Sequence, residues 1–140
     1  MKNLLRRLLP TKAAACRRGA TAVEFALIFP VFLAFVLGII EVGRAMWIKG
    51  SLQYAVEETT RYAMVNTSAS DTTLEAYATS KLMGVGVSST GVTFQATQDT
   101  SSGTTYVTIT GIYVFQGLTS FLPYFDAVTL NAKSRAPLNS

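Results

Sequence analysis

The sequence predicts an α+β protein in which a long N-terminal helix precedes a small head. The first half of this helix is expected in a membrane, and its second half is expected to be amphipathic. Two observations predict this architecture. Residues 25–40 form an uncharged apolar run, and helical spacing of apolar residues continues from there to about residue 65. After residue 66 the chain becomes rich in Ser and Thr and alternates as strands do. We therefore expect a short helix and about three antiparallel strands in the head.

The composition excludes several classes of function. The chain has 140 residues, of which 49% are hydrophobic and 14% charged, whereas soluble domains average about 25% charged residues. It has no histidine and one cysteine, which excludes Ser-His-Asp and Cys-His catalysis, histidine-containing zinc sites and an internal disulfide. No other set of polar residues converges in the sequence. We expect no enzymatic activity, no metal and no cofactor.

Charge is distributed unevenly along the chain. Residues 1–19 contain six basic residues and no acid, while the remainder contains six basic and eight acidic residues. A nucleic-acid-binding domain would spread its basic residues over a folded face, so we expect no nucleic-acid partner. A basic segment directly before an apolar span predicts that the N-terminus stays in the cytoplasm and that the head is exported.

The apolar stretch from about residue 21 to residue 40 predicts a membrane span. As a helix it rises roughly 30 Å, which is the thickness of the hydrocarbon core of a bilayer. A buried core helix is the alternative, but the rest of this small chain lacks the apolar residues needed to surround it. The sequence after Ile40 lacks the small-residue cleavage site of an ordinary secretory signal.

The helix continues over 41–65 as an amphipathic segment. Apolar residues recur at helical spacing on one face, and Glu41, Lys49, Gln53, Glu57 and Arg61 line another. The Glu57–Arg61 spacing predicts an i,i+4 ion pair. Trp47 and Tyr54 are expected either at the outer membrane–water boundary or in ordinary core packing.

The head contains three predicted strands, at 91–96, 106–115 and 127–135. A short helix is predicted over 71–83, with Asp71 or Thr72 as its N-cap and glycines after it as its end. A turn is predicted at 99–103. The apolar segment 117–125 is expected to cover a sheet edge, or else to form a partner contact.

Glu24 is a carboxylate at the start of the apolar stretch, where an unpaired charge costs several kcal/mol at membrane depth. One interpretation is a boundary residue solvated by headgroups. The other follows from its distance to Gly19. If the chain is cut after Gly19, the new α-amino group of Ala20 can pair with Glu24 of an adjacent subunit and fix the stagger of packed helices.

The start of the chain resembles the signal of prepilins. It consists of a basic leader, Arg-Arg-Gly at 17–19, four further residues, Glu24 and an apolar helix. The motifs Ala-Val-Glu-Phe-Ala at 22–26, Glu-Val-Gly-Arg at 41–44 and Thr-Arg-Tyr-Ala at 60–63 resemble the TadE-like family. Its members are minor pilins, or pseudopilins, of the tight-adherence (Tad/Flp, type IVc) pilus. The resemblance is close over residues 17–66 and loose beyond them.

This resemblance implies a domain organisation and a set of site residues. Residues 1–19 would be the leader, 20–66 the long helix and 67–140 the head. Arg18, Gly19 and Ala20 would form the cleavage site. Glu24 and Phe25 would align subunits, although major pilins of this type commonly have tyrosine where Phe25 stands. Separately from the resemblance, Pro30 inside the span is expected to kink the helix, either with a role in assembly or as a tolerated kink of no consequence.

The resemblance also implies a structural role in pilus assembly. The implied partners are a prepilin peptidase, the major Flp pilin, a sister pseudopilin and the inner-membrane assembly platform. The implied location is the bacterial inner membrane, with a periplasmic C-terminus and incorporation into an extracellular pilus as an option. The alternative is an uncleaved, bitopic scaffold or adhesion module whose exported head binds a partner.

Overall fold

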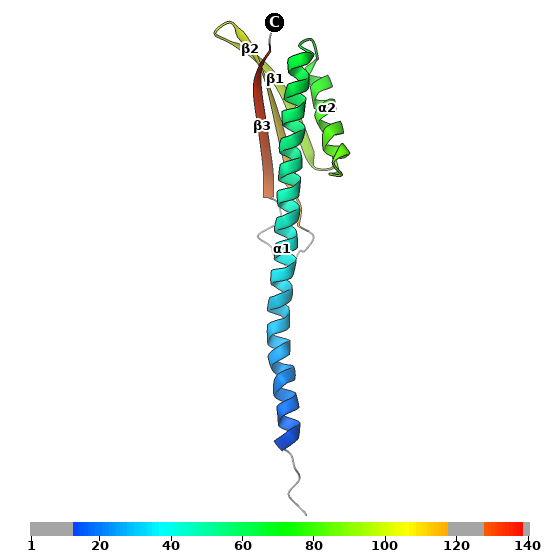
Figure 1. The fold of residues 1–140 in the computed structure, drawn as a ribbon, viewed down its shortest axis with the longest axis vertical. Helices are drawn as coiled ribbons and strands as arrows, with labels where there is room; N and C mark the ends of the chain where they lie inside the picture. Colours follow the sequence, from blue (N-terminus) through cyan, green and yellow to red (C-terminus); the bar gives the residue numbers. More distant parts are fainter. Residues whose placement is uncertain (1–12, 118–127, 139–140) are drawn as a thin grey trace, which may run out of the picture. The chain divides into compact units, whose positions relative to one another are not determined.

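The computed structural model describes residues 13–117 and 128–138 and confirms the α+β fold (Figure 1). Its elements are α1 (Ala13–Val65), α2 (Asp71–Gly84), β1 (Val92–Ser101), β2 (Thr104–Phe115) and β3 (Val128–Leu138). The chain divides into two compact units, with the boundary between Ile39 and Ile40 of α1. The predicted segment 117–125 lies outside the described residues from position 118 onward.

The helix α1 begins earlier than predicted. It starts at Ala13, inside the segment predicted as leader, and runs 53 residues to Val65. Its C-terminal end agrees with the prediction. The helix remains α-helical through Pro30, even though proline cannot donate the backbone hydrogen bond to the carbonyl one turn earlier.

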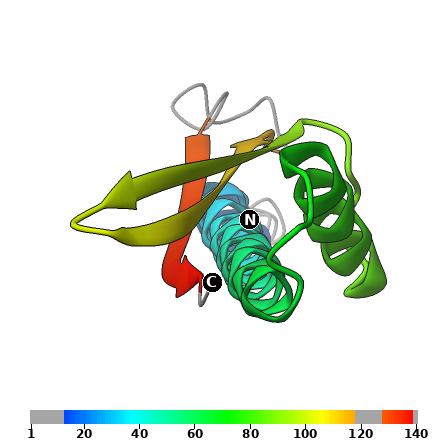
Figure 2. The same ribbon diagram turned by 90° about the horizontal axis from the view of Figure 1, so that it is seen from above.

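The second unit is a layer of two helices on one face of a three-stranded antiparallel sheet, in the order β1-β2-β3. Seen from above, α2 lies on the β1 side of α1 and β3 on the opposite side (Figure 2). The alternating residues of the covered sheet face meet α1 and α2 in one buried core. Its members include Leu52, Val56, Leu74, Leu82, Phe94, Val107, Ile109, Phe115, Ala132 and Leu138. The other sheet face carries mostly Thr, Gln, Asn and Lys side chains.

Local sequence sets the ends of these elements. The hydroxyl of Ser70, not the predicted Asp71 or Thr72, caps α2 by accepting a hydrogen bond from the amide of Thr73 at 3.3 Å. The β1–β2 hairpin turns through Ser102 and Gly103, both with positive φ. Two positive φ values are required by a type I′ turn, which matches the twist of paired strands.

The free edge of β1 is closed by α2. A carboxylate oxygen of Glu75 accepts a hydrogen bond from the amide of Ala96 at 3.2 Å. Nearby, the Gln98 amide group contacts the Asp71 carboxylate and the Ala69 carbonyl. The Glu75 contact satisfies one backbone amide that an edge strand otherwise leaves open to pairing with other chains, and the Gln98 contacts hold α2 beside it.

Two predictions about the polar face of α1 are wrong. Glu41 is only 4% exposed, so it does not line a solvated face. Glu57 accepts a hydrogen bond from Gln53 at 2.7 Å, while Arg61 lies 3.9 Å from Glu58 instead of pairing with Glu57. Lys81 of α2 also approaches Glu58, at 3.7 Å, so this acid lies between two cations.

Helix α1 approaches the sheet closely at Gly111. A Cβ atom there would lie 2.9 Å from the Phe94 ring and 3.0 Å from a methyl group of Leu52. A glycine in the middle of a strand normally weakens it, so this position is explained by the space that the helix occupies.

We predict that Gly111→Ala destabilises the second unit by about 1–3 kcal/mol, the usual cost of overpacking a core. The measurement is thermal and denaturant unfolding of the full chain in detergent, followed by circular dichroism. Gly50→Ala is the matched control, because a Cβ at this helical glycine meets nothing within 4 Å. It should leave stability unchanged or raise it by up to about 1 kcal/mol. Equal stability of the two variants would contradict the close approach.

Candidate membrane and assembly segment

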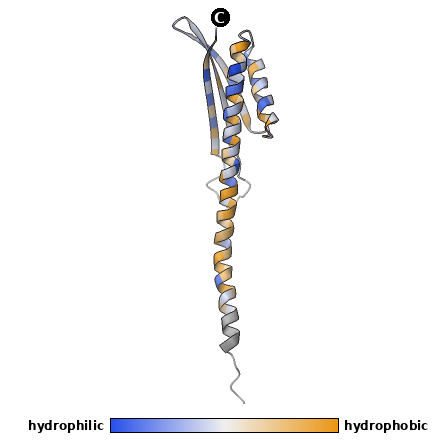
Figure 3. Ribbon diagram, viewed as in Figure 1, coloured by the Kyte–Doolittle hydropathy of each residue, from blue (hydrophilic) through white to orange (hydrophobic). Residues whose placement is uncertain are grey.

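The apolar part of α1 is exposed in the part of the chain that the structure describes. Large hydrophobic side chains along residues 23–40 are exposed, and the most apolar window has none of its residues buried. Figure 3 shows this part of α1 as a hydrophobic stretch of the helix. This is one helix long and apolar enough to cross a membrane, among the described residues. The alternative of a buried core helix is therefore wrong.

The predicted processing site lies in this same helix. The backbone of Arg18 is helical, and Gly19 and Ala20 are helical and exposed. A peptidase needs its scissile bond accessible and locally unwound. Glycine favours unwinding, because it is about 1 kcal/mol less favourable than alanine inside a helix.

Glu24 and Phe25 are both exposed, as a role between subunits requires. Ala20 and Glu24 are four residues apart in α1, so they lie one turn apart on the same face. Phe25 stacks on Phe29, with ring centroids 5.2 Å apart, and Pro30 follows directly. The structure thus places Glu24 near the position where cleavage would create an α-amino group.

Just after the apolar stretch, two charged residues turn toward the sheet. Arg44 Nη2 lies 3.3 Å from a carboxylate oxygen of the buried Glu41. The guanidinium stands over the Phe115 ring, 4.5 Å from its centroid, and donates a hydrogen bond to the carbonyl of Gln116. Sequence reasoning missed this contact. The i,i+3 spacing of Glu41 and Arg44 was its only signal, because Phe115 is far away in sequence.

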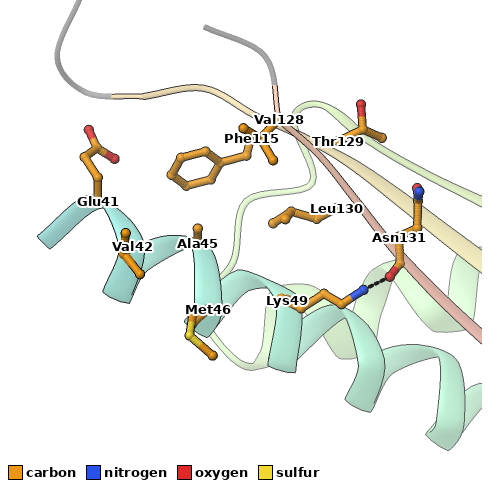
Figure 4. Close-up of a pocket in the computed structure, with 10 residues that line it drawn as sticks. All are labelled: Glu41, Val42, Ala45, Met46, Lys49, Phe115, Val128, Thr129, Leu130 and Asn131. Carbon is orange, nitrogen blue, oxygen red and sulfur yellow. Dashed lines mark hydrogen bonds between the residues drawn. The ribbon is translucent and has the colours of Figure 1, made fainter. Parts of the chain in front are cut away.

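A groove opens beside this pair, between α1 and the start of β3 (Figure 4). Its volume is about 390 Å³. The walls are mostly apolar, and Lys49 spans one end by donating a hydrogen bond to the carbonyl of Asn131. The lining residues are Glu41, Val42, Ala45, Met46, Lys49, Phe115, Val128, Thr129, Leu130 and Asn131.

Two other clusters of charged and aromatic residues hold elements together. Tyr62 of α1 stacks on Tyr77 of α2 with centroids 4.2 Å apart, and Lys81 lies over the Tyr77 ring. The Tyr77 side chain raises the pKa of Lys81 above its ordinary value, with a smaller contribution from Glu58, so this cation stays charged at neutral pH.

The second cluster lies on the outer sheet face. Arg135 of β3 reaches across Tyr106 of β2, 4.2 Å from its ring centroid, and pairs with Asp99 of β1 at 2.9 Å. It therefore connects all three strands. Both clusters consist of pairs between neighbouring elements, and in the described part of the chain no three potential ligands gather as a metal site requires.

A comparison with protein families shows what the helix is similar to. A family model described as TadE-like protein matches residues 19–61. This segment resembles the TadE-like family. It begins at Gly19, includes Glu24 and the apolar stretch, and ends at Arg61 near the end of α1. No curated protein and no solved structure matches the chain.

The match confirms the predicted resemblance over residues 19–61. The match lies within α1. The head, with α2 and the three strands, lies outside the matched residues.

We predict that two charges in the middle of the span release the chain from membranes. Leu33→Arg with Val36→Arg should cost about 3 kcal/mol for each substitution at bilayer depth. The fraction retained in membranes after alkaline carbonate extraction measures the effect. Gln95→Arg with Thr97→Arg adds the same charges on exposed positions of β1 and serves as the control. Equal retention of both double variants would argue against insertion of this segment.

Proposed function

We propose that the protein is a pseudopilin, or minor pilin, of a Tad/Flp-type pilus, cleaved after Gly19 and assembled with the pilus or priming its assembly. The TadE-like match over residues 19–61 is the observation that carries this proposal. It coincides with an exposed apolar helix that carries one acid near its start.

The proposed processing follows from the chemistry around Gly19. A prepilin peptidase would hydrolyse the Gly19–Ala20 bond and remove the basic leader, in which six positive charges hold the N-terminus on the cytoplasmic side. The head is then periplasmic, and the mature chain begins with a cationic α-amino group four residues before Glu24.

Glu24 would align the helix of the mature chain with the helices of neighbouring subunits. In an assembled bundle its carboxylate would pair with the α-amino group of a neighbouring subunit, so that both ions are neutralised at once in a low-dielectric environment. An unpaired ion there would cost several kcal/mol, which disfavours any other stagger of the helices. The partners of this assembly are the major Flp pilin, a sister pseudopilin and the inner-membrane platform.

The first test is the mass of the intact protein, with N-terminal sequencing, after expression with and without the cognate prepilin peptidase. We predict a peptidase-dependent start at Ala20. Gly19→Leu should abolish cleavage, because a bulky side chain resists the unwinding that the scissile bond needs. Gly38→Leu places the same residue elsewhere in α1 and should be cleaved normally. A start at Met1 under every condition would favour the uncleaved, bitopic scaffold instead.

The second test separates cleavage from assembly. We predict that Glu24→Ala leaves cleavage intact and lowers incorporation into sheared pili, or the number of pili, at least about tenfold, as expected for leaving one partner of a desolvated ion pair uncompensated. Glu57→Ala removes an exposed acid from another part of α1 and serves as the control. Normal assembly of the Glu24 variant would exclude the registration role.

A further inference from the structure

The surface of α1 stays apolar beyond the predicted end of the membrane span. Exposed fractions are 50% for Val42, 70% for Met46 and 63% for Trp47, and the exposed Gly43 lies between them. These residues follow Ile40 directly in sequence. A stretch so exposed in a folded unit normally marks a surface that something covers.

The two charges in this stretch do not interrupt that surface. Glu41 is 4% exposed and lies 3.3 Å from Arg44. Arg44 in turn is held by the ring of Phe115 and the carbonyl of Gln116. Two opposite charges in an ion pair cost far less at low dielectric than separate ions, so Glu41 can lie at this depth with Arg44 as its partner.

The neighbouring sheet extends the apolar surface sideways. The groove between α1 and β3 has Val42, Ala45 and Met46 on one wall and Val128 and Leu130 on the other (Figure 4). Val128 is 37% exposed at its rim. The next charged side chain along α1 is Lys49, whose long aliphatic stem lets its ammonium reach a polar layer while the stem stays in an apolar one.

We infer that the outer surface of the lipid bilayer lies at Trp47, about two turns of helix beyond Ile40. In this arrangement Val42, Met46, Trp47 and the rim of the groove are immersed in the interfacial layer of phospholipids. The Glu41–Arg44 pair lies at headgroup depth inside the protein. The inference rests on the proposed membrane span and adds that the base of the second unit is itself embedded.

Helix length agrees with this depth. Glu24 and Trp47 are separated by 23 residues of α1, which rise about 35 Å. A bilayer has a hydrocarbon core of about 30 Å and a total thickness of about 40–45 Å with its headgroups. Both residues then lie in headgroup layers, where a carboxylate is solvated and a tryptophan is favoured. If the outer surface of the bilayer lay at residue 40 instead, Trp47 would stand about 10 Å away from it in water.

The test uses Trp47 as an intrinsic probe, because it is the only tryptophan of the chain. The full chain is reconstituted into phosphatidylcholine–phosphatidylglycerol vesicles, and its emission is measured with lipids brominated near the acyl carbonyl and with aqueous iodide. We expect the brominated lipid to reduce Trp47 emission by about half or more, and iodide to reduce it little, as for an interfacial indole.

A second variant calibrates the depth. Trp47→Phe with Tyr54→Trp moves the probe two turns further along α1, to a position where the native side chain is 45% exposed. This probe should respond to iodide and not to brominated lipid. The opposite result, with both probes quenched by lipid, would place the surface beyond residue 54 and overturn the assignment.

Other outcomes separate the inference from the proposed function. Failure of the chain to float with the vesicles would refute the membrane span itself. Flotation with strong iodide quenching of Trp47 would refute only the embedded base. Protection of Trp47 from both quenchers would mean that a second copy of the chain covers it in place of lipid, and would also overturn the inference.

Discussion

The rest of this structure depends on one constraint: none of the described residues buries the first apolar half of α1. Nearly all side chains from Val23 to Ile40 are exposed, whereas the core of the second unit is completed by α2 and three strands. A surface of that size is stable only in lipid or against other apolar helices. Anchoring and assembly are therefore two solutions to the same physical problem.

The same helix changes its role after residue 40, because what it meets changes. In the second unit one face of α1 is buried against the sheet through residues such as Leu52 and Val56, and the close approach at Gly111 makes this contact dense. The opposite face, with Met46 and Trp47, stays uncovered. The sheet therefore buries one face of the amphipathic part of α1. The opposite face of that part stays exposed.

Most of the architecture was predictable, because each element carries its own periodicity. The apolar run predicted the exposed apolar part of α1. The alternation of apolar and polar residues predicted the three strands, and the glycines after residue 83 predicted the end of α2. The errors concern side chains whose environment comes from distant segments. Burial of Glu41 depends on an environment built partly from β2, and the choice of Arg61 for Glu58 accompanies the approach of Lys81 from α2.

The candidate site was predictable to a different degree. The apolar run could be identified from the sequence, and the roles of Gly19 and Glu24 rest on their spacing along the same helix and stay predictions. The Glu41–Arg44 pair and the groove could not be identified, since both need the sheet to be in place. No spacing rule joins Arg44 to Phe115 or Lys49 to Asn131 before the register of β2 and β3 is known.

The way α1 holds the sheet also bears on why the family match lies within this helix. Its two basic residues at the base of the second unit, Arg44 and Lys49, donate hydrogen bonds to backbone carbonyls, those of Gln116 and Asn131. A backbone carbonyl is present whatever side chain a strand carries. A helix with these donors can hold sheets of different sequence, provided that two strand ends arrive at the same place. Both donors lie within the TadE-like match at residues 19–61, whereas the strands that they hold lie outside it.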